Sequence, residues 1–295
     1  MNCSCFDRLT SFIASTNGHN PVRYQTLRVT GGSGIQTIHL HRPSASNAIN
    51  HTMVRELSLL LQGLEAEETT KVVVFEGLPS VFCSGIDFQE YFQSEPGDSP
   101  PDRQVMLSDF YDLLDQLSHS SKIIVSKVTG AVTAGGIGFP AVSDLVIAQE
   151  GATFALSELL FGLLPAIVLP FLIRRVGTHK ARLLALSTQP LSATEAHGWG
   201  LVDAQGPDPD KLLRPYLQRW RRLSPLAIAR LKSYMHLLPS APALDVRTER
   251  TQTQTSADSM TKALAVKTIS DLLSDPEIAL RIRRFIEGDA LPWST

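Results

Sequence analysis

A pair of glycines and one glutamate carry the strongest chemical signal in this sequence. Gly135 and Gly136 follow an apolar stretch at residues 123–128, and Glu158 lies downstream within the apolar run 154–164. A strand that ends in glycines at the start of a helix leaves backbone N–H groups exposed, and the helix dipole reinforces them. Such groups can stabilise an oxyanion, and a nearby carboxylate can act as general acid or base. Together these residues indicate chemistry through an enolate.

A second turn of the same kind lies at residues 82–87. Gly85 allows the chain to turn sharply, which would leave the backbone N–H of Ile86 available as a donor. Either turn alone is a weak signal, because most such turns only connect a strand to a helix. Two of them, about fifty residues apart, fit an oxyanion hole built from two N–H groups, those of Ile86 and Gly135.

Simpler interpretations of these residues stay open. Glu158 could be an ordinary carboxylate at a helix N-terminus, and Asp87 an ordinary N-cap. Residues 136–141 also fit the glycine fingerprint of dinucleotide-binding folds, although the helix after them would be only about seven residues long. Cys83 has no basic neighbour in the sequence and is interpreted as a packing residue rather than a nucleophile.

The composition is typical of a globular enzyme and excludes several other classes. The chain has 295 residues, 43% of them hydrophobic, and a net charge of −2, so no basic surface for nucleic acid or anionic membranes is indicated. No apolar run approaches the ~18–20 residues of a transmembrane helix. Only three cysteines occur and they form no disulfide pattern. We therefore predict a cytoplasmic protein that binds neither nucleic acid nor membrane.

The order of the expected elements predicts an α/β fold. Strands are expected within 23–40 (two, around a glycine-rich turn) and at 71–75, 123–128, 144–148 and 153–156, and helices at 51–67, 104–118, 225–238 and most of 242–287. Residues 95–103 are expected to form a surface loop. Residues 1–22 are predicted to be a flexible tail, 23–205 the core and 206–295 a helical region for capping or trimerisation.

Residues 23–290 resemble the enoyl-CoA hydratase/isomerase (crotonase) superfamily. The resemblance rests on motifs that occur in the family's order and spacing: Arg42-Pro43, Asn47-Ala48, and residues 82–87, 130–144, 154–165 and 196–203. It implies a spiral of β-β-α turns followed by a C-terminal helical region, and assembly as a homotrimer or hexamer. No cofactor or metal is implied beyond the thioester's own carrier.

The resemblance also assigns roles to individual residues. It places the oxyanion hole on the N–H groups of Ile86 and Gly135, and one of the two catalytic glutamates of the hydratases on Glu158. The other glutamate position falls on Gly138, so this chain lacks it. If a second acid–base group is needed, Asp87 is the first candidate and Tyr91 the second. The expected substrate-binding residues are Gly136, Gly138 and Tyr91.

A narrower resemblance is to the dehydratases of polyketide β-branching, which convert 3-hydroxy-3-methylglutaryl carried on an acyl carrier protein to 3-methylglutaconyl. It rests on residues 154–165 and 168–175 and on the turn at 85–88. Gln89 and Ser44 replace lysines that in the family usually lie near the nucleotide of CoA. This departure is consistent with a phosphopantetheine arm in place of CoA, and therefore with an acyl carrier protein as partner.

Other activities remain as alternatives. A hydratase or a Δ3-Δ2-enoyl-CoA isomerase could use Glu158 alone, and a non-catalytic or RNA-binding relative would not need it. Lys127 or Arg174 could receive the terminal carboxylate of a methylglutaryl group. A basic group that could face an acidic carrier protein consists of Arg174, Arg175, Lys180 and Arg182.

Overall fold

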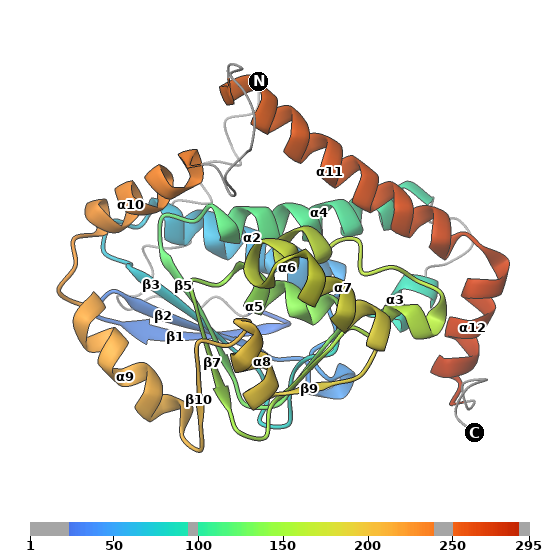
Figure 1. Ribbon diagram of the computed structural model, residues 1–295, viewed down its shortest axis with the longest axis horizontal. Coiled ribbons are helices and arrows are strands. Elements are labelled where there is room, and N and C mark those ends of the chain that lie inside the picture. The colour runs from blue at the N-terminus through green and yellow to red at the C-terminus, as the bar shows by residue number, and fades with distance from the viewer. Residues whose placement is uncertain (1–23, 94–99, 239–249, 289–295) are drawn as a thin grey trace.

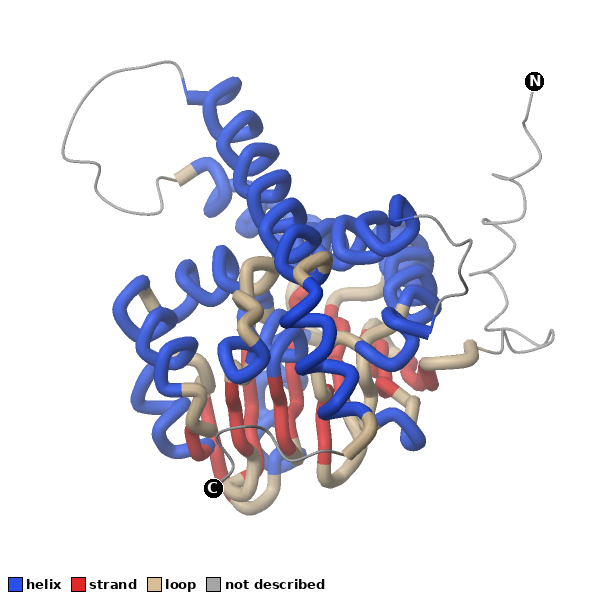
Figure 2. The backbone as a smooth tube through the Cα atoms, turned by 90° about the vertical axis from the view of Figure 1, so that its right-hand side faces the viewer, coloured by secondary structure: helices blue, strands red, loops and turns tan. Residues whose placement is uncertain are grey.

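The computed structural model describes residues 24–93, 100–238 and 250–288, which form two β-sheets surrounded by helices (Figures 1 and 2). The larger sheet has the order β1-β2-β3-β5-β7-β10 and the smaller β4-β6-β8-β9. The strand bounds are β1 Leu27–Gly32, β2 Ile35–Leu40, β3 Val72–Glu76, β4 Val81–Cys83, β5 Ile123–Val128, β6 Ala131–Thr133, β7 Leu145–Gln149, β8 Thr153–Ala155, β9 Leu191–Ser192 and β10 Ala204–Gly206.

From β3 to β8, successive strands alternate between the two sheets, which confirms the predicted β-β-α spiral. The strands β3, β5 and β7 lie side by side and parallel in the larger sheet. The strand that follows each of them, β4, β6 and β8 respectively, lies parallel to its neighbour in the smaller sheet. The ends of β4, β6 and β8 therefore lie next to one another along the smaller sheet, and residues that follow these strands come together although they are far apart in sequence.

The predicted hairpin at the start of the described chain is confirmed. β1 and β2 pair antiparallel, with Gly32 opposite Ile35. Ser33 and Gly34 form the turn with φ angles of 54° and 79°. Two consecutive positive φ values are characteristic of the tight turns that match the twist of paired strands. The hairpin forms the edge of the larger sheet.

Three short 3₁₀ helices and eleven α-helices are described. The 3₁₀ helices are η2 (Pro43–Ala45), η3 (Ala134–Ile137) and η4 (Glu158–Phe161), and the α-helices are α2 His51–Ala66, α3 Phe88–Gln93, α4 Pro100–Ser118, α5 Gly138–Val142, α6 Leu169–Val176, α7 Thr178–Ser187, α8 Ala193–Trp199, α9 Pro209–Trp220, α10 Pro225–Leu237, α11 Arg250–Leu273 and α12 Pro276–Ile286. Helix α4 begins at Pro100, which corrects the loop predicted for 95–103. A proline fits the first turn of a helix, because its missing N–H would have no partner there. The rest of that predicted loop, residues 95–99, lies outside the described residues, as does the tail at 1–22.

Both faces of the central strands of the larger sheet, β3, β5 and β7, are buried. Val73 and Phe75 point into the main core, which includes α2 and α4, while Val72 and Val74 point to a second core beneath α9 and α10. Burial on both faces explains why its central parallel strands are almost continuously apolar. The C-terminal helices extend from this body: α11 packs along α4 in Figure 1, and α12 turns back against α3 and η4.

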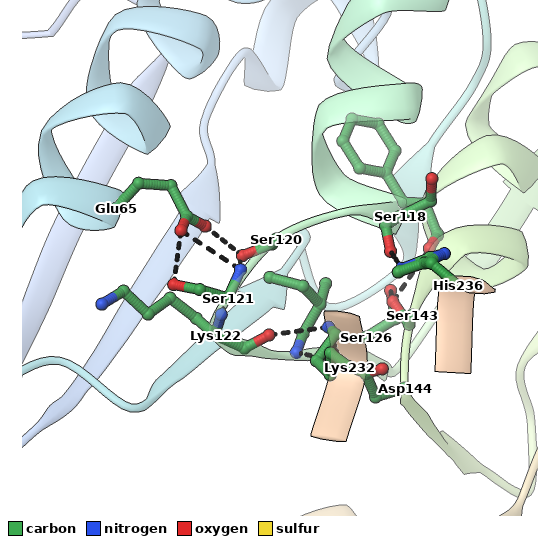
Figure 3. Close-up of polar contacts among 12 residues, drawn as sticks. Glu65, Ser118, Ser120, Ser121, Lys122, Ser126, Ser143, Asp144, Lys232 and His236 are labelled. Carbon is green, nitrogen blue, oxygen red and sulfur yellow. Dashed lines mark hydrogen bonds and ion pairs between the residues drawn. The ribbon is translucent and has the colours of Figure 1, made fainter. Parts of the chain in front are cut away.

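Polar contacts fix α10 to the edge of this body (Figure 3). The Lys232 ammonium contacts the carboxylate of Asp144 and donates to the backbone oxygen of Lys122 at 2.8 Å. His236 bonds through Nε2 to the backbone oxygen of Ser118 at 3.0 Å. These contacts lie at the opposite end of α4 from α12 in Figure 1, so they serve the fold rather than the site described below.

Candidate active site

Ile86, Gly135 and Glu158 line one cavity of about 550 Å³. The cavity lies between the smaller sheet and the C-terminal helices, because η3 and η4 border it on one side and Phe285 and Ile286 of α12 on the other. Its remaining wall is mainly apolar. Three residues predicted from the sequence as one chemical constellation are thus brought together by the fold.

The first donor turn is shaped by backbone pairing with Ile49. The N–H of Ile49 donates to the oxygen of Gly85 at 2.7 Å, and the N–H of Asp87 donates to the oxygen of Ile49 at 2.9 Å. In this parallel bridge the residue between the two bonds, Ile86, directs its own N–H away from Ile49. Gly85 has φ +93°, a conformation that favours glycine. The geometry makes Ile86 the donor of this turn.

The second donor turn comes from the start of η3. Gly135 is the second residue of this 3₁₀ helix, where a backbone N–H has no partner within the helix. Ala134 before it has φ +50°, which is rare for a residue with a side chain. A non-glycine residue in the left-handed region stores strain, and such residues concentrate at functional sites. The aim of the Gly135 N–H is therefore fixed by an unusual backbone conformation.

Glu158 is the one carboxylate of the predicted constellation that is buried and keeps an oxygen atom without a partner among the described residues. Its side chain is 9% exposed, and its Oε2 atom has no hydrogen-bond partner among the described residues. Burial raises the pKa of this carboxyl from 4.5 to about 7. Desolvation destabilises the charged form, and backbone N–H groups offset only part of that effect. A carboxyl with this pKa can both accept and return a proton near neutral pH.

Asp87 lines the same cavity but its carboxylate is already engaged. Oδ2 lies 2.9 Å from an Nη atom of Arg42, and Oδ1 accepts from the N–H of Glu90 at 3.1 Å. The second contact is an N-cap of α3, which was one of the open interpretations. Tyr91, one turn further on, lies outside the described cavity lining, and its ring packs edge-to-face on Phe92 with centroids 5.3 Å apart.

Gly136 and Gly138 serve close packing behind the cavity wall. A Cβ at Gly136 would lie 2.7 Å from the backbone oxygen of Cys83, so only glycine fits there. A Cβ at Gly138 would lie 2.7 Å from Leu114 and 3.2 Å from Val168. Neither glycine belongs to the described cavity lining. Apolar side chains thus occupy the space beside Gly138, the position at which the resemblance to the hydratases places their second glutamate.

The cations suggested by the sequence lie outside the described cavity lining. The Lys127 ammonium, near the C-terminal end of β5, is 2.8 Å from Glu76 and 2.7 Å from Asp210. Arg174 lies over the ring of Phe171, with 5.3 Å between its Cζ atom and the ring centroid. In the basic group, Arg175 pairs with Asp203 at 2.6 Å and Lys180 donates to the backbone oxygen of Trp199 at 2.9 Å.

Two features of the site were missed from the sequence. The ion pair between Arg42 and Asp87 joins residues far apart in the chain. The sequence marked Arg42 only as part of the motif Arg42-Pro43 and gave no sign of a partner for its side chain. The contribution of α12 to the cavity was also missed, because apolar residues such as Phe285 in a helix carry no mark of the surface they will face.

The described part of the chain contains no group of His, Cys, Asp or Glu side chains suited to hold a metal. Within the same residues, no helix combines the length and apolarity needed to cross a membrane.

Comparison with known proteins places this geometry in a family. A profile of the enoyl-CoA hydratase/isomerase family matches residues 30–269. The chain is 42% identical over 273 residues to the bacillaene synthase dehydratase PksH of Bacillus subtilis, covering 92% of this chain and 98% of that one. It is also 30% identical over 171 residues to the 1,2-epoxyphenylacetyl-CoA isomerase of Escherichia coli, which is 57% of this chain and 65% of the relative.

Solved structures agree with the sequence comparison. The crystal structure of a polyketide biosynthesis enoyl-CoA hydratase (PksH) from Bacillus subtilis superposes with a TM-score of 0.78 at 39% identity, over 92% of this chain and all of that one. An enoyl-CoA hydratase from Bacillus halodurans shares the fold with a TM-score of 0.74 at 17% identity, over 88% of this chain and 99% of its own. Sequence, fold and site geometry agree, and the chain belongs to the enoyl-CoA hydratase/isomerase family.

Proposed function

We propose that this chain is a hydro-lyase that dehydrates a 3-hydroxyacyl thioester carried by an acyl carrier protein. The specific reaction is 3-hydroxy-3-methylglutaryl to 3-methylglutaconyl. The observation that carries the proposal is the cavity in which one buried carboxylate, that of Glu158 with its unpartnered Oε2 atom, shares the wall with Ile86 and Gly135. The similarity to a dehydratase over nearly the full length of both chains supports the reaction type.

In the proposed first step the thioester oxygen accepts hydrogen bonds from the N–H groups of Ile86 and Gly135. These bonds acidify the C2 proton and stabilise the enolate that forms when Glu158 removes it. Loss of one such donor typically costs ~2.7–4 kcal/mol of transition-state stabilisation. Two donors held by a rigid turn and a 3₁₀ helix are aimed before the substrate arrives, so little reorganisation accompanies the reaction.

In the second step the same carboxyl returns the proton. The enolate re-forms the carbonyl and expels the C3 hydroxyl, while protonated Glu158 donates its proton to the departing oxygen. Water leaves, the C2–C3 double bond remains, and Glu158 is again a carboxylate. A single group can perform both transfers because its pKa of about 7 makes both forms accessible. No second carboxylate is required at Gly138, and the engaged carboxylate of Asp87 is not needed as an acid or base.

The mainly apolar wall would exclude water from the acyl chain of the bound substrate. Leu163, Ile167, Val168, Ile269 and Leu273 border the cavity and would surround the acyl chain. The described lining contains no lysine, arginine or histidine. A terminal carboxylate would therefore be received by hydroxyl groups of the lining, such as those of Thr133 and Ser157, or remain in water at the opening.

We further propose that the chain assembles as a homotrimer or hexamer through its C-terminal helices. Large apolar side chains of α10 and α11 are exposed in the single chain: Leu231 is 59% exposed, Met260 73% and Leu264 68%. Exposed large apolar side chains on a helix surface favour an interface over contact with water. Light scattering on the purified chain distinguishes a monomer from a trimer and a hexamer.

The experiment that tests the reaction compares one substrate on two carriers. The purified chain is incubated with 3-hydroxy-3-methylglutaryl on an acyl carrier protein and, separately, on CoA, and loss of one water is followed by intact mass. Glu158→Gln removes the proton-transfer group and should abolish dehydration. Glu150→Gln, an exposed glutamate in a turn after β7, is the matched control and should retain activity.

Each outcome has a separate meaning. Dehydration on the carrier protein that disappears in Glu158→Gln supports the reaction and the residue together. Dehydration that survives this substitution rejects Glu158 as the acid–base group. Absence of water loss on both carriers overturns the proposed reaction, and double-bond isomerisation of an enoyl thioester, followed by NMR, becomes the next activity to measure.

A further inference from the structure

The segment 42–50 lies along the first donor turn and is bonded to it at several points. Asn47 is fully buried, and its Nδ2 donates to the backbone oxygen of Phe82 at 3.0 Å. Its Oδ1 accepts from the N–H of Arg42 at 2.8 Å. Asn47 has φ +55°, so this segment holds a strained conformation to make these bonds. The two bonds of Ile49 described above continue the same contact to Gly85 and Asp87.

Arg42 closes this arrangement with its side chain. One Nη atom donates to the backbone oxygen of Ala48 at 2.5 Å, and the other lies 2.9 Å from Oδ2 of Asp87. The same guanidinium is 3.5 Å from Glu90, which also accepts from Asn50 at 2.7 Å. The pair is largely withdrawn from water, with 18% of the Arg42 side chain and 9% of the Asp87 side chain exposed. The guanidinium of Arg42 therefore joins Ala48, just before Ile49, to Asp87, just after Ile86.

We propose that the Arg42–Asp87 ion pair is a positioning device that fixes the aim of the Ile86 N–H into the cavity. This inference rests on the proposed function, in which that N–H polarises the thioester carbonyl. Ile86 lies between Gly85 and Asp87, and both of these neighbours are bonded to residues of the segment 42–50. Arg42 and Asp87 are thus positioning residues, and Asp87 takes no part in proton transfer.

The physical argument is that a buried pair responds strongly to the loss of one partner. Removing the cation leaves the Asp87 carboxylate without its compensating charge in a poorly solvated position. The turn must then shift to expose the carboxylate or bind a solvent cation. Active-site groups need placement within about 0.5 Å of the productive geometry. A small displacement of Ile86 therefore lowers the stabilisation of the enolate while the substrate still binds.

The test uses three variants. Arg42→Met removes the cation, and Asp87→Asn removes the anion but keeps an oxygen that can cap α3. Lys232→Met is the matched control, because Lys232 also pairs with an aspartate, Asp144, and donates to the backbone oxygen of Lys122 at 2.8 Å, outside the described cavity lining. We expect kcat to fall about 10- to 100-fold in the first two variants with KM changed little. The control should keep kcat.

Two readouts separate positioning from a general loss of structure. The first is the infrared carbonyl stretch of ¹³C-labelled 3-methylglutaryl-pantetheine, which lacks the reacting hydroxyl; its shift to lower frequency on binding should shrink in Arg42→Met and Asp87→Asn. The second is the crystal structure of each variant without substrate, in which the Ile86 nitrogen should move relative to that of Gly135. The pH dependence of kcat should keep its wild-type shape in Asp87→Asn.

The outcomes are distinguishable from failure of the proposed reaction. An unmoved Ile86 nitrogen in both variants overturns the positioning role, whatever substrate the enzyme uses. An altered pH profile in Asp87→Asn with unmoved donors would instead assign Asp87 to proton transfer. If the wild type dehydrates neither thioester, the proposed reaction fails, while the crystal structures still decide whether the ion pair holds the donor turn.

Discussion

Gly85 and Ala134 lie so close together that a Cβ added to Gly85 would be 2.7 Å from the Cβ of Ala134. The same added atom would be 3.1 Å from the backbone nitrogen of Gly135. The two donor turns are therefore in direct contact, and the absence of a side chain at Gly85 sets their separation. Ala134 contributes from its side a left-handed conformation with φ +50°. The distance between the N–H groups of Ile86 and Gly135 is therefore set by the contact between Gly85 and Ala134.

We expect Gly85→Ala to abolish dehydration. The substitution adds a left-handed strain of roughly 1–2 kcal/mol and also a clash that pushes the two turns apart. Gly200→Ala is the control, because Gly200 has φ +83° but open space around it. Both variants should lose similar stability from the backbone strain, and only Gly85→Ala should lose activity as well. Equal activity of the two variants would show that donor spacing does not limit the reaction.

The rate of dehydration should depend on pH through Glu158. Burial raises the pKa of this carboxyl to about 7, and the ionised form is the one that removes the C2 proton. The value of kcat/KM should therefore fall about tenfold per pH unit below pH ~7 and level off above it. The measurement is a pH profile on the carrier-bound substrate. A profile that stays level down to pH ~5 would indicate a base with an ordinary pKa.

The same carboxyl should make stability depend on pH. Between the unfolded pKa of 4.5 and the folded pKa of about 7, the folded chain holds a proton that the unfolded chain has released. Stability therefore falls as pH rises through this window, by an amount on the order of 3 kcal/mol when ionisation is complete. Glu158→Gln removes this cost, so it should be more stable than wild type at pH 8 and lose that advantage near pH 4.

Urea unfolding at the two pH values measures this difference. Glu150→Gln, with its exposed side chain, serves as the comparison and should change stability equally at both pH values. A Glu158→Gln variant that is less stable than wild type at pH 8 would mean that the ionised carboxylate is well solvated or paired in solution.

Local sequence signals predicted the helices and strands around the site. Contacts between residues far apart in the sequence, which complete the site, could not be predicted from them. Ser192 and Glu195 form a capping box at the start of α8, a motif that can be recognised in a sequence because both partners lie within one helical turn. Glu158 begins η4 shortly after the end of β8 at Ala155, as the end of the apolar strand pattern indicated. The pair of Arg42 and Asp87 could not be predicted in this way. Its partners lie on different segments, and only the fold decides which of many charged side chains meet.

Lys127 should be dispensable for substrate binding. Its ammonium pairs with Glu76 and Asp210, away from the described cavity lining, so Lys127→Met should leave KM for the carrier-bound substrate within about twofold of wild type. Stability should fall by about 1 kcal/mol, because the pair is only partly withdrawn from solvent. Steady-state kinetics and thermal unfolding measure the two effects. A KM raised tenfold at unchanged stability would place this lysine in the binding of the terminal carboxylate.

Restoring a glutamate at Gly138 should not create a two-carboxylate hydratase. The added side chain meets Leu114 and Val168, both buried, so Gly138→Glu should lower stability by about 1–3 kcal/mol through overpacking and leave hydration of enoyl thioesters no faster than in wild type. Adding Leu114→Ala opens space and should recover part of that stability. Leu113→Ala, at an equally buried neighbouring leucine, should only add its own cost. If Gly138→Glu alone hydrates an enoyl thioester faster than wild type does, the apolar closure of this position is not what separates the chain from the hydratases.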